Sequence, residues 1–160
     1  MHLRLTTSAD RDLLEGLLVA AFNWNGQTRV TLDQIRTDAR YTHHLAGWQR
    51  TTDLGVVAEA ESGPPMGAAW ARVVTAEEAG YGFIADDVPE LGMAVLAPYR
   101  GHGLGSQLLD ACLAALRDAG HTAVSLSVED GNSVARRLYD TRNFLPVGRV
   151  GGSDTLLLRL

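Results

Sequence analysis

The chain has 160 residues, of which 46% are hydrophobic and 21% charged, and a formal net charge of -5. A chain of this length can bury roughly 70% of its unfolded surface, so we expect residues 1–160 to form a single domain. All of its cations are arginines and they form no basic run, which argues against nucleic acid as a partner.

Targeting, disulfide and metal signals are missing from the sequence. The longest apolar stretch, Leu17–Phe22, is far too short to cross a bilayer, and the first residues lack the apolar segment of a signal peptide. We therefore expect a cytoplasmic protein with no membrane partner. One cysteine, Cys112, cannot form an internal disulfide, and no His and Cys spacing resembles a metal site, so no metal is expected. Its helical spacing with leucines predicts a core thiol.

The first third alternates weak strand and helix signals. Residues 3–6 predict a short strand, and Ser8 or Asp10 then caps an amphipathic helix that runs to Phe22. A second, more polar helix is predicted from Thr31 to about Arg40.

The middle third predicts a β-hairpin followed by a long connection. Two strands, residues 54–59 and 66–74, are joined by Gly63-Pro64-Pro65, whose backbone angles suit a tight reversal. Residues 75–88 form a connection that is long for a compact domain. This segment is either a substrate loop or a solvated excursion.

The next segment predicts a β-α-β unit. Residues 90–96 form a strand, residues 98–105 a glycine-rich turn, and residues 106–119 a helix that Gly120 closes. The following strand, residues 121–128, should pair in parallel with the first through a right-handed crossover.

The chain then ends in a short helix and a hairpin. The helix covers residues 132–140, with Val134 and Leu138 predicted to point inward. The hairpin strands are residues 145–150 and 155–160.

The glycine-rich segment Arg100–Ser106 is the strongest chemical signal. It separates an apolar strand from a helix start, where free N–H groups and the helix dipole can hold a diphosphate. Because position 106 is Ser, no dinucleotide fingerprint is formed, and no Gly-Lys-Ser/Thr follows as in a Walker A loop. A purely structural turn before a helix is the remaining alternative.

The segment resembles the acetyl-CoA motif of the GNAT family of N-acetyltransferases, Gln/Arg-x-x-Gly-x-Gly/Ala, as Arg100-x-x-Gly103-x-Gly105. A second family motif follows at Leu126–Val128, Asn132–Tyr139 and Asn143-Phe144, so the resemblance covers Met66–Val150. The family usually has Leu-Gly-Phe where this chain has Arg142-Asn143-Phe144, and Asn is the next-best residue for a left-handed helix cap.

The resemblance implies an α/β (α+β) fold. Its mixed, mostly antiparallel sheet has about six or seven strands with a central splayed parallel pair, flanked by about four helices. It also implies acetyl-CoA as co-substrate, with no metal. The expected cofactor-binding residues come from the strand, the glycine-rich turn and the following helix: Met93, Ala94, Val95, Arg100, Gly101, His102, Gly103, Leu104, Gly105, Ser106, Asn132 and Tyr139.

Catalytic roles follow from the same resemblance. Tyr139 stands where many family members place the tyrosine that protonates the departing CoA thiolate, although a core aromatic would also explain it. Asn132 matches a CoA-contacting asparagine and equally suits a helix cap. Glu90 is the expected general base, with Asp86 and Asp87 as alternatives.

We expect an N-acetyltransferase that moves acetyl from acetyl-CoA to a primary amine, on a small molecule or a peptide, by direct attack in a ternary complex. The alternative is a catalytically silent acyl-CoA sensor. The acidic cluster at residues 86–90 should attract a cationic amine. A homodimer is possible from family habit. Candidates for the acceptor pocket are Trp24, Tyr41, His43, His44, Trp48, Trp70 and Arg72. For the two histidines, exposed polar residues are the plainer interpretation.

Overall fold

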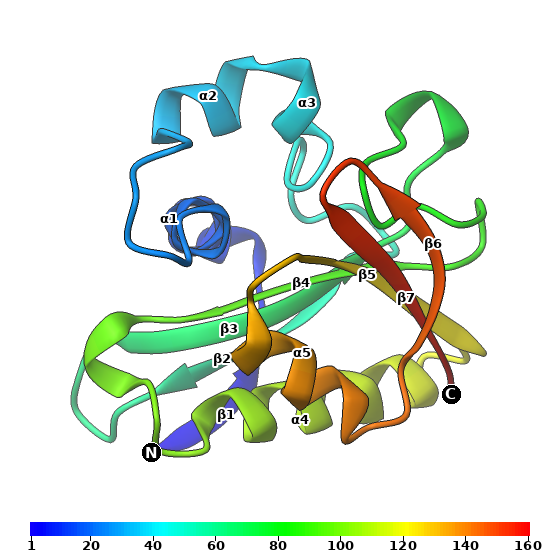
Figure 1. Ribbon diagram of the computed structural model, residues 1–160. Coiled ribbons are helices and arrows are strands. Elements are labelled where there is room, and N and C mark those ends of the chain that lie inside the picture. The colour runs from blue at the N-terminus through cyan, green and yellow to red at the C-terminus, as the bar shows by residue number, and fades with distance from the viewer.

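The computed structural model describes residues 1–160 as a seven-stranded mixed sheet with helices on both faces (Figure 1). The strand order is β1-β2-β3-β4-β5-β7-β6, and only β4 and β5 run parallel. The strands are β1 (His2–Leu5), β2 (Leu54–Glu59), β3 (Pro65–Arg72), β4 (Glu90–Val95), β5 (Ala123–Glu129), β6 (Leu145–Val150) and β7 (Ser153–Arg159). The predicted mixed sheet with a central parallel pair is confirmed.

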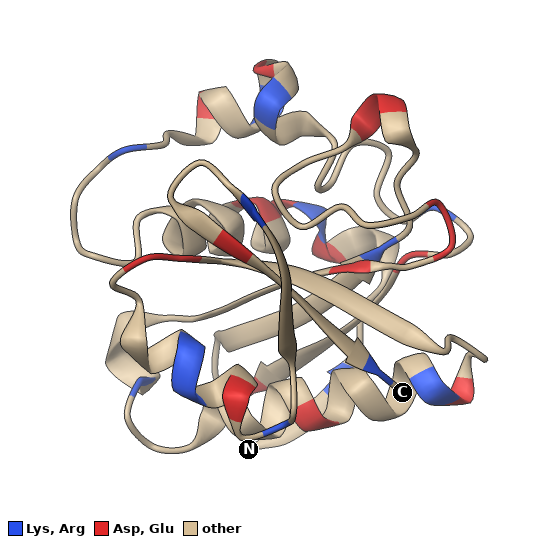
Figure 2. Cartoon of the chain, turned by 45° about the vertical axis from the view of Figure 1, so that its right-hand side comes forward, with Lys and Arg blue, Asp and Glu red and all other residues tan.

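Two layers of helices cover the sheet. Figure 1 shows α1, α2 and α3 above one face and α4 and α5 below the other. None of these helices is long and apolar enough to span a membrane. Figure 2 shows acidic and basic residues interspersed along the helices and loops. The helices are α1 (Arg11–Phe22), α2 (Leu32–Thr37), α3 (Ala39–Thr42), α4 (Leu104–Asp118) and α5 (Ser133–Asp140), and the short 3₁₀ turns are Ser8–Asp10, Ala76–Glu78 and Ala97–Tyr99.

Strand alternation divides the interior into two apolar cores. On β3, Ala69 and Ala71 face the α4 layer, whereas Ala68 and Trp70 face the α1 layer, because successive strand side chains point to opposite faces. The buried stripe of α4, which includes Leu108 and Cys112, fills the first core. The prediction of a core thiol at Cys112 is thus confirmed, and burial raises the pKa of that thiol to about 12.

The start of α1 and the region of α2 and α3 differ from the prediction. The side chain of Asp10 does not cap α1; it accepts a hydrogen bond from Thr7 N–H at 2.7 Å and pairs with Arg4. The single helix predicted for residues 31–40 is instead two helices. Asp38 adopts an extended conformation between them, and its carboxylate caps α3. A capping residue can end one helix and start the next.

Three further predictions, for the glycine-rich turn, α5 and the helix caps, can be compared with the structure. Helix α4 begins at Leu104 rather than at Ser106, because Gly103, with φ of 78°, turns the chain directly into the helix. Val134 is 83% exposed, so its predicted inward orientation is wrong; Tyr139 is the buried residue of α5, and Ala135 and Leu138 are the ones that pack against the core. The expected left-handed caps are confirmed at Gly120, with φ of 88°, and Asn143, with φ of 64°.

Candidate active site

The parallel strands β4 and β5 separate soon after they meet. Their ladder contains one residue pair, Glu90 with Ser125, although both strands continue beyond it. Leu96 N–H donates to Met66 on β3, so the alternation of an antiparallel ladder turns the backbone groups of Met93 and Val95 away from β3 and toward the gap. The gap therefore exposes strand backbone that no neighbouring strand pairs with.

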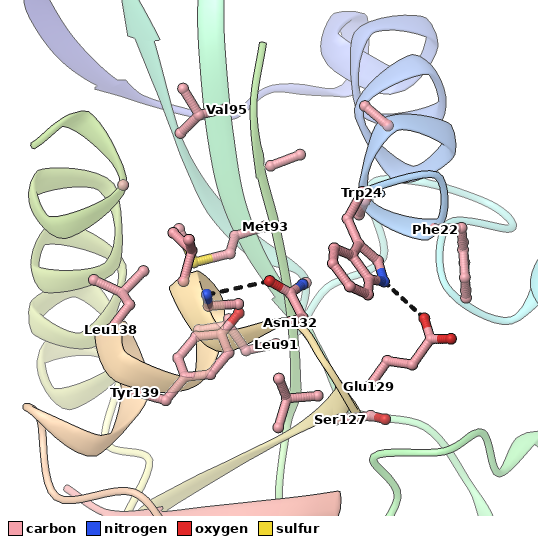
Figure 3. Close-up of a pocket in the computed structure, with 18 of the residues that line it drawn as sticks. Phe22, Trp24, Leu91, Met93, Val95, Ser127, Glu129, Asn132, Leu138 and Tyr139 are labelled. Carbon is pink, nitrogen blue, oxygen red and sulfur yellow. Dashed lines mark hydrogen bonds between the residues drawn. The ribbon is translucent and has the colours of Figure 1, made fainter. Parts of the chain in front are cut away.

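A cavity of about 1060 Å³ occupies this gap. Figure 3 shows Tyr139 and Leu138 on one side of β4 and Phe22 and Trp24 on the other. Of the expected cofactor-binding residues, all but His102 line the cavity. His102 is exposed. The cavity thus joins the α4–α5 side of the sheet to the α1–α3 side.

The glycine-rich turn presents backbone donors at the α4 end of the cavity. Gly101 and Gly103 adopt positive φ angles of 81° and 78°. The first intrahelical hydrogen bond of α4 is Gln107 N–H to Gly103, so the preceding N–H groups of the turn remain free for an anion. Arg100 Nε donates to the Val95 carbonyl at 2.8 Å and so ties the turn to the end of β4.

Both residues predicted to bind the cofactor near α5, Asn132 and Tyr139, line the cavity. The Asn132 side chain accepts a hydrogen bond from Ala135 N–H at 3.3 Å, so it caps α5 while also lining the cavity. Tyr139 is buried, and its ring lies 5.6 Å from that of Phe144. Burial raises the pKa of the Tyr139 phenol above its ordinary value. It is therefore a neutral hydroxyl that can donate a proton.

Glu90 reaches the cavity from the opposite face of β4. The carboxylate is 8% exposed, and its Oε1 accepts a hydrogen bond from Gly82 N–H at 3.2 Å, whereas Oε2 has no partner. Burial raises the pKa of Glu90 to about 7. A carboxyl that is partly ionised near neutral pH can accept a proton and release it again.

Two histidines lie beside Glu90. Nitrogen atoms of His43 and His44 and a carboxylate oxygen of Glu90 all lie within 4.8 Å of one another. The sequence-based preference for two exposed histidines is wrong: His43 is 7% exposed, with Gly80 packed on its ring, and His44 is half-buried. Burial lowers the pKa of His44 to about 3, so this ring is neutral. By type these three groups suit either proton exchange or a divalent metal.

The connection before β4 holds this site together. Ser125 Oγ donates to the Gly82 carbonyl at 2.6 Å, and Thr155 Oγ1 donates to the Tyr81 carbonyl at 2.8 Å. Tyr81 lines the cavity. Asp86 and Asp87 are exposed and do not line it, so the segment contributes an aromatic wall and a backbone donor rather than an acidic cluster.

The proposed acceptor residues divide into two groups. Trp24, Tyr41 and His44 line the cavity. His43, Trp48, Trp70 and Arg72 do not, because they are buried between the sheet and the segments that cover it. Sequence reasoning missed four aromatic or charged residues that line the acceptor side of the cavity, and only the position of Tyr81 in a long loop signalled one of them. These four are Phe22, Arg29, Tyr81 and Glu129.

Comparison of the chain with protein families and with solved structures agrees with this geometry. The family model for the acetyltransferase (GNAT) family matches residues 18–144, so the chain belongs to that family. A ribosomal-protein-alanine N-acetyltransferase from Brucella melitensis is 22% identical, with a TM-score of 0.71 and full coverage (100%) of both chains. The yncA protein of Salmonella typhimurium, solved with acetyl-CoA, is 21% identical, with a TM-score of 0.66 over 100% of this chain and 94% of that one. PaiA N-acetyltransferase from Thermoplasma acidophilum, solved with coenzyme A, is 16% identical, with a TM-score of 0.71 over 100% of both.

Proposed function

We propose that the protein is an N-acetyltransferase that moves acetyl from acetyl-CoA to a primary amine by direct attack in a ternary complex. The observation that carries this proposal is the position of Glu90 and Tyr139. Both open onto one cavity at the place where β4 and β5 separate, and they approach it from opposite faces of the sheet. An amine can thus enter on one face while the thiolate leaves on the other.

Acetyl-CoA would bind through backbone groups and Arg137. The free N–H groups at the start of α4 suit its diphosphate, and Arg137 also lines the cavity, whereas the guanidinium of Arg142 is paired with Asp110. The pantetheine arm would enter the gap and pair with Met93 and Val95 as an additional strand would. Asn132 and the turn Arg100–Ser106 border this route.

The chemical step needs one base and one acid. Glu90 accepts a proton from the acceptor ammonium, directly or through one water, and frees the nitrogen lone pair. The nitrogen attacks the thioester carbonyl carbon and passes its second proton to water, and the carbon–sulfur bond breaks as the tetrahedral intermediate collapses. Tyr139 gives its proton to the departing CoA thiolate and regains one from solvent.

Backbone groups of β4 would stabilise the intermediate. The Met93 N–H points into the gap, where the carbonyl oxygen of the thioester gains negative charge during attack. A donor that is fixed before the reaction lowers the barrier, and such a donor is typically worth about 3 kcal/mol. No side chain is required for this role.

The test is CoA release from acetyl-CoA across a panel of amines, run beside a calorimetric titration of acetyl-CoA into the protein. Amine-dependent release supports the transferase. Tight acetyl-CoA binding without release for any amine would favour a catalytically silent sensor, and no binding would overturn both functions. A parallel reaction with EDTA shows whether a metal held by the two histidines and Glu90 contributes, since the proposed mechanism needs none.

A further inference from the structure

The acceptor side of the cavity has mainly apolar and aromatic walls. Edge-on packing joins Phe22 to Tyr41, with ring centroids 5.0 Å apart, and Phe22 to His44, at 5.7 Å. Trp24 lies on the same side of β4 as Phe22, and its indole N–H donates to Glu129 at the end of β5 (Figure 3). Further lining residues on this side are Leu18, Ala20, Ala21, Val30 and Tyr81. Such a surface gains free energy by burying an apolar body.

The charges on this side are almost fully compensated. Glu129 Oε1 accepts from Arg29 Nη1 at 2.6 Å, and its Oε2 accepts from Trp24 Nε1 at 2.7 Å and Arg29 Nη2 at 2.8 Å. Arg29 also donates to the Phe22 carbonyl. With His44 neutral, Glu90 is the one carboxylate left without a cationic partner.

Resting on the proposed function, we propose that the acceptor is a monoamine with an apolar or aromatic body, such as an arylalkylamine. One free carboxylate matches one ammonium group. A second ammonium would lie against the aromatic wall without a counter-ion, and an amino acid carboxylate would find no free cation there. Burying an uncompensated charge costs more free energy than a cation–π contact returns, so desolvation decides against both.

Two matched pairs of acceptors test the proposal. 2-Phenylethylamine and phenylalanine differ by one carboxylate, and hexylamine and 1,6-diaminohexane differ by one amine. We expect kcat/KM to be at least about 30-fold higher for the first member of each pair, the factor that an uncompensated charge of about 2 kcal/mol produces. Equal or higher values for phenylalanine or the diamine would overturn the substrate class while leaving the transferase intact.

A variant and a binding measurement separate the two proposals. Phe22→Leu should lower kcat/KM for 2-phenylethylamine more than for hexylamine, because a ring contact is lost. The matched variant Phe83→Leu changes a half-buried ring that does not line the cavity and should leave the ratio unchanged. Calorimetry with 2-phenylethylamine and the CoA-saturated protein gives a readout without turnover. Binding without turnover supports the pocket chemistry and overturns the transferase; neither binding nor turnover overturns both.

Discussion

Arg72 and Glu90 lie directly opposite each other on β3 and β4, yet the arginine does not neutralise the carboxylate. Its guanidinium pairs with buried Asp53, with Nε to Oδ1 at 2.8 Å, and donates to the carbonyls of His43 at 3.1 Å and Ala46 at 2.7 Å. Arg72 therefore anchors the segment after α3 over the sheet, and Glu90 stays without a cation. This arrangement lets burial raise the pKa of Glu90.

The pH dependence of turnover should follow Glu90. Below pH 7 the carboxyl of the free enzyme is increasingly protonated and cannot accept the ammonium proton, so kcat/KM for the amine should rise about tenfold per pH unit up to about pH 7 and then level off. Glu90→Gln should lower kcat/KM by a factor on the order of 100 to 10,000 and remove this fall at acid pH. The measurement is kcat/KM for the amine from pH 5 to 9. If Glu90→Gln shows the same fall in activity at acid pH as the wild type, a group other than Glu90 is the general base.

The same carboxyl should make stability depend on pH. The pKa of Glu90 is raised from 4.5 to about 7 in the folded protein, so the unfolded chain loses its proton first. Folding stability is then greatest below pH 4.5 and falls by up to about 3 kcal/mol as the pH rises to 7. Glu90→Gln keeps an acceptor for Gly82 and should be more stable than wild type at pH 8. Urea titrations at pH 5 and 8 test this, with exposed Glu77→Gln as a control that should track the wild type.

The sequence predicted the strand, turn and helix around Arg100–Ser106 better than it predicted the acceptor side of the cavity. The turn at Arg100–Ser106, the strand before it and the helix after it follow from local glycine, periodicity and capping signals. The aromatic walls on the acceptor side of the cavity do not follow from such local signals, because contacts between residues distant in the sequence create them. The Trp24–Glu129 hydrogen bond joins residues 105 positions apart. Arg72, a predicted pocket residue, is buried in the interior, where it pairs with Asp53. No local pattern encodes either pairing.

Tyr139 should act in the chemical step rather than in binding. Tyr139→Phe keeps the ring that packs beside Phe144 and removes only the hydroxyl. We expect kcat to fall on the order of 100-fold, because the thiolate must leave without a positioned acid, while the Kd for acetyl-CoA stays within about twofold. Stopped-flow acetyl transfer and calorimetric titration measure the two quantities. A large loss of acetyl-CoA affinity with unchanged kcat would assign Tyr139 a structural role.

Gly103 and Gly105 of the glycine-rich turn should respond differently to alanine. Gly103 has φ of 78°, so Gly103→Ala strains the turn by about 1–2 kcal/mol and displaces the N–H groups that follow it. A Cβ at Gly105 would meet Leu138, Met93 and Val95 at ordinary contact distances of 3.6–3.8 Å. Gly103→Ala should weaken acetyl-CoA binding about tenfold, and Gly105→Ala much less. Equal Kd values for both variants and wild type would contradict diphosphate binding at this turn.

The buried Arg72–Asp53 pair should matter for folding and for the position of the histidines. Removing one partner leaves an uncompensated buried charge, so Asp53→Asn should lower the free energy of unfolding by about 3–5 kcal/mol. The double variant Asp53→Leu with Arg72→Met removes both charges and should recover most of this loss, as denaturant titration can measure. It also frees the carbonyls of His43 and Ala46 from the arginine, so the recovered protein should still have a lower kcat. Full activity in that variant would show that Arg72 stabilises the fold without positioning the site.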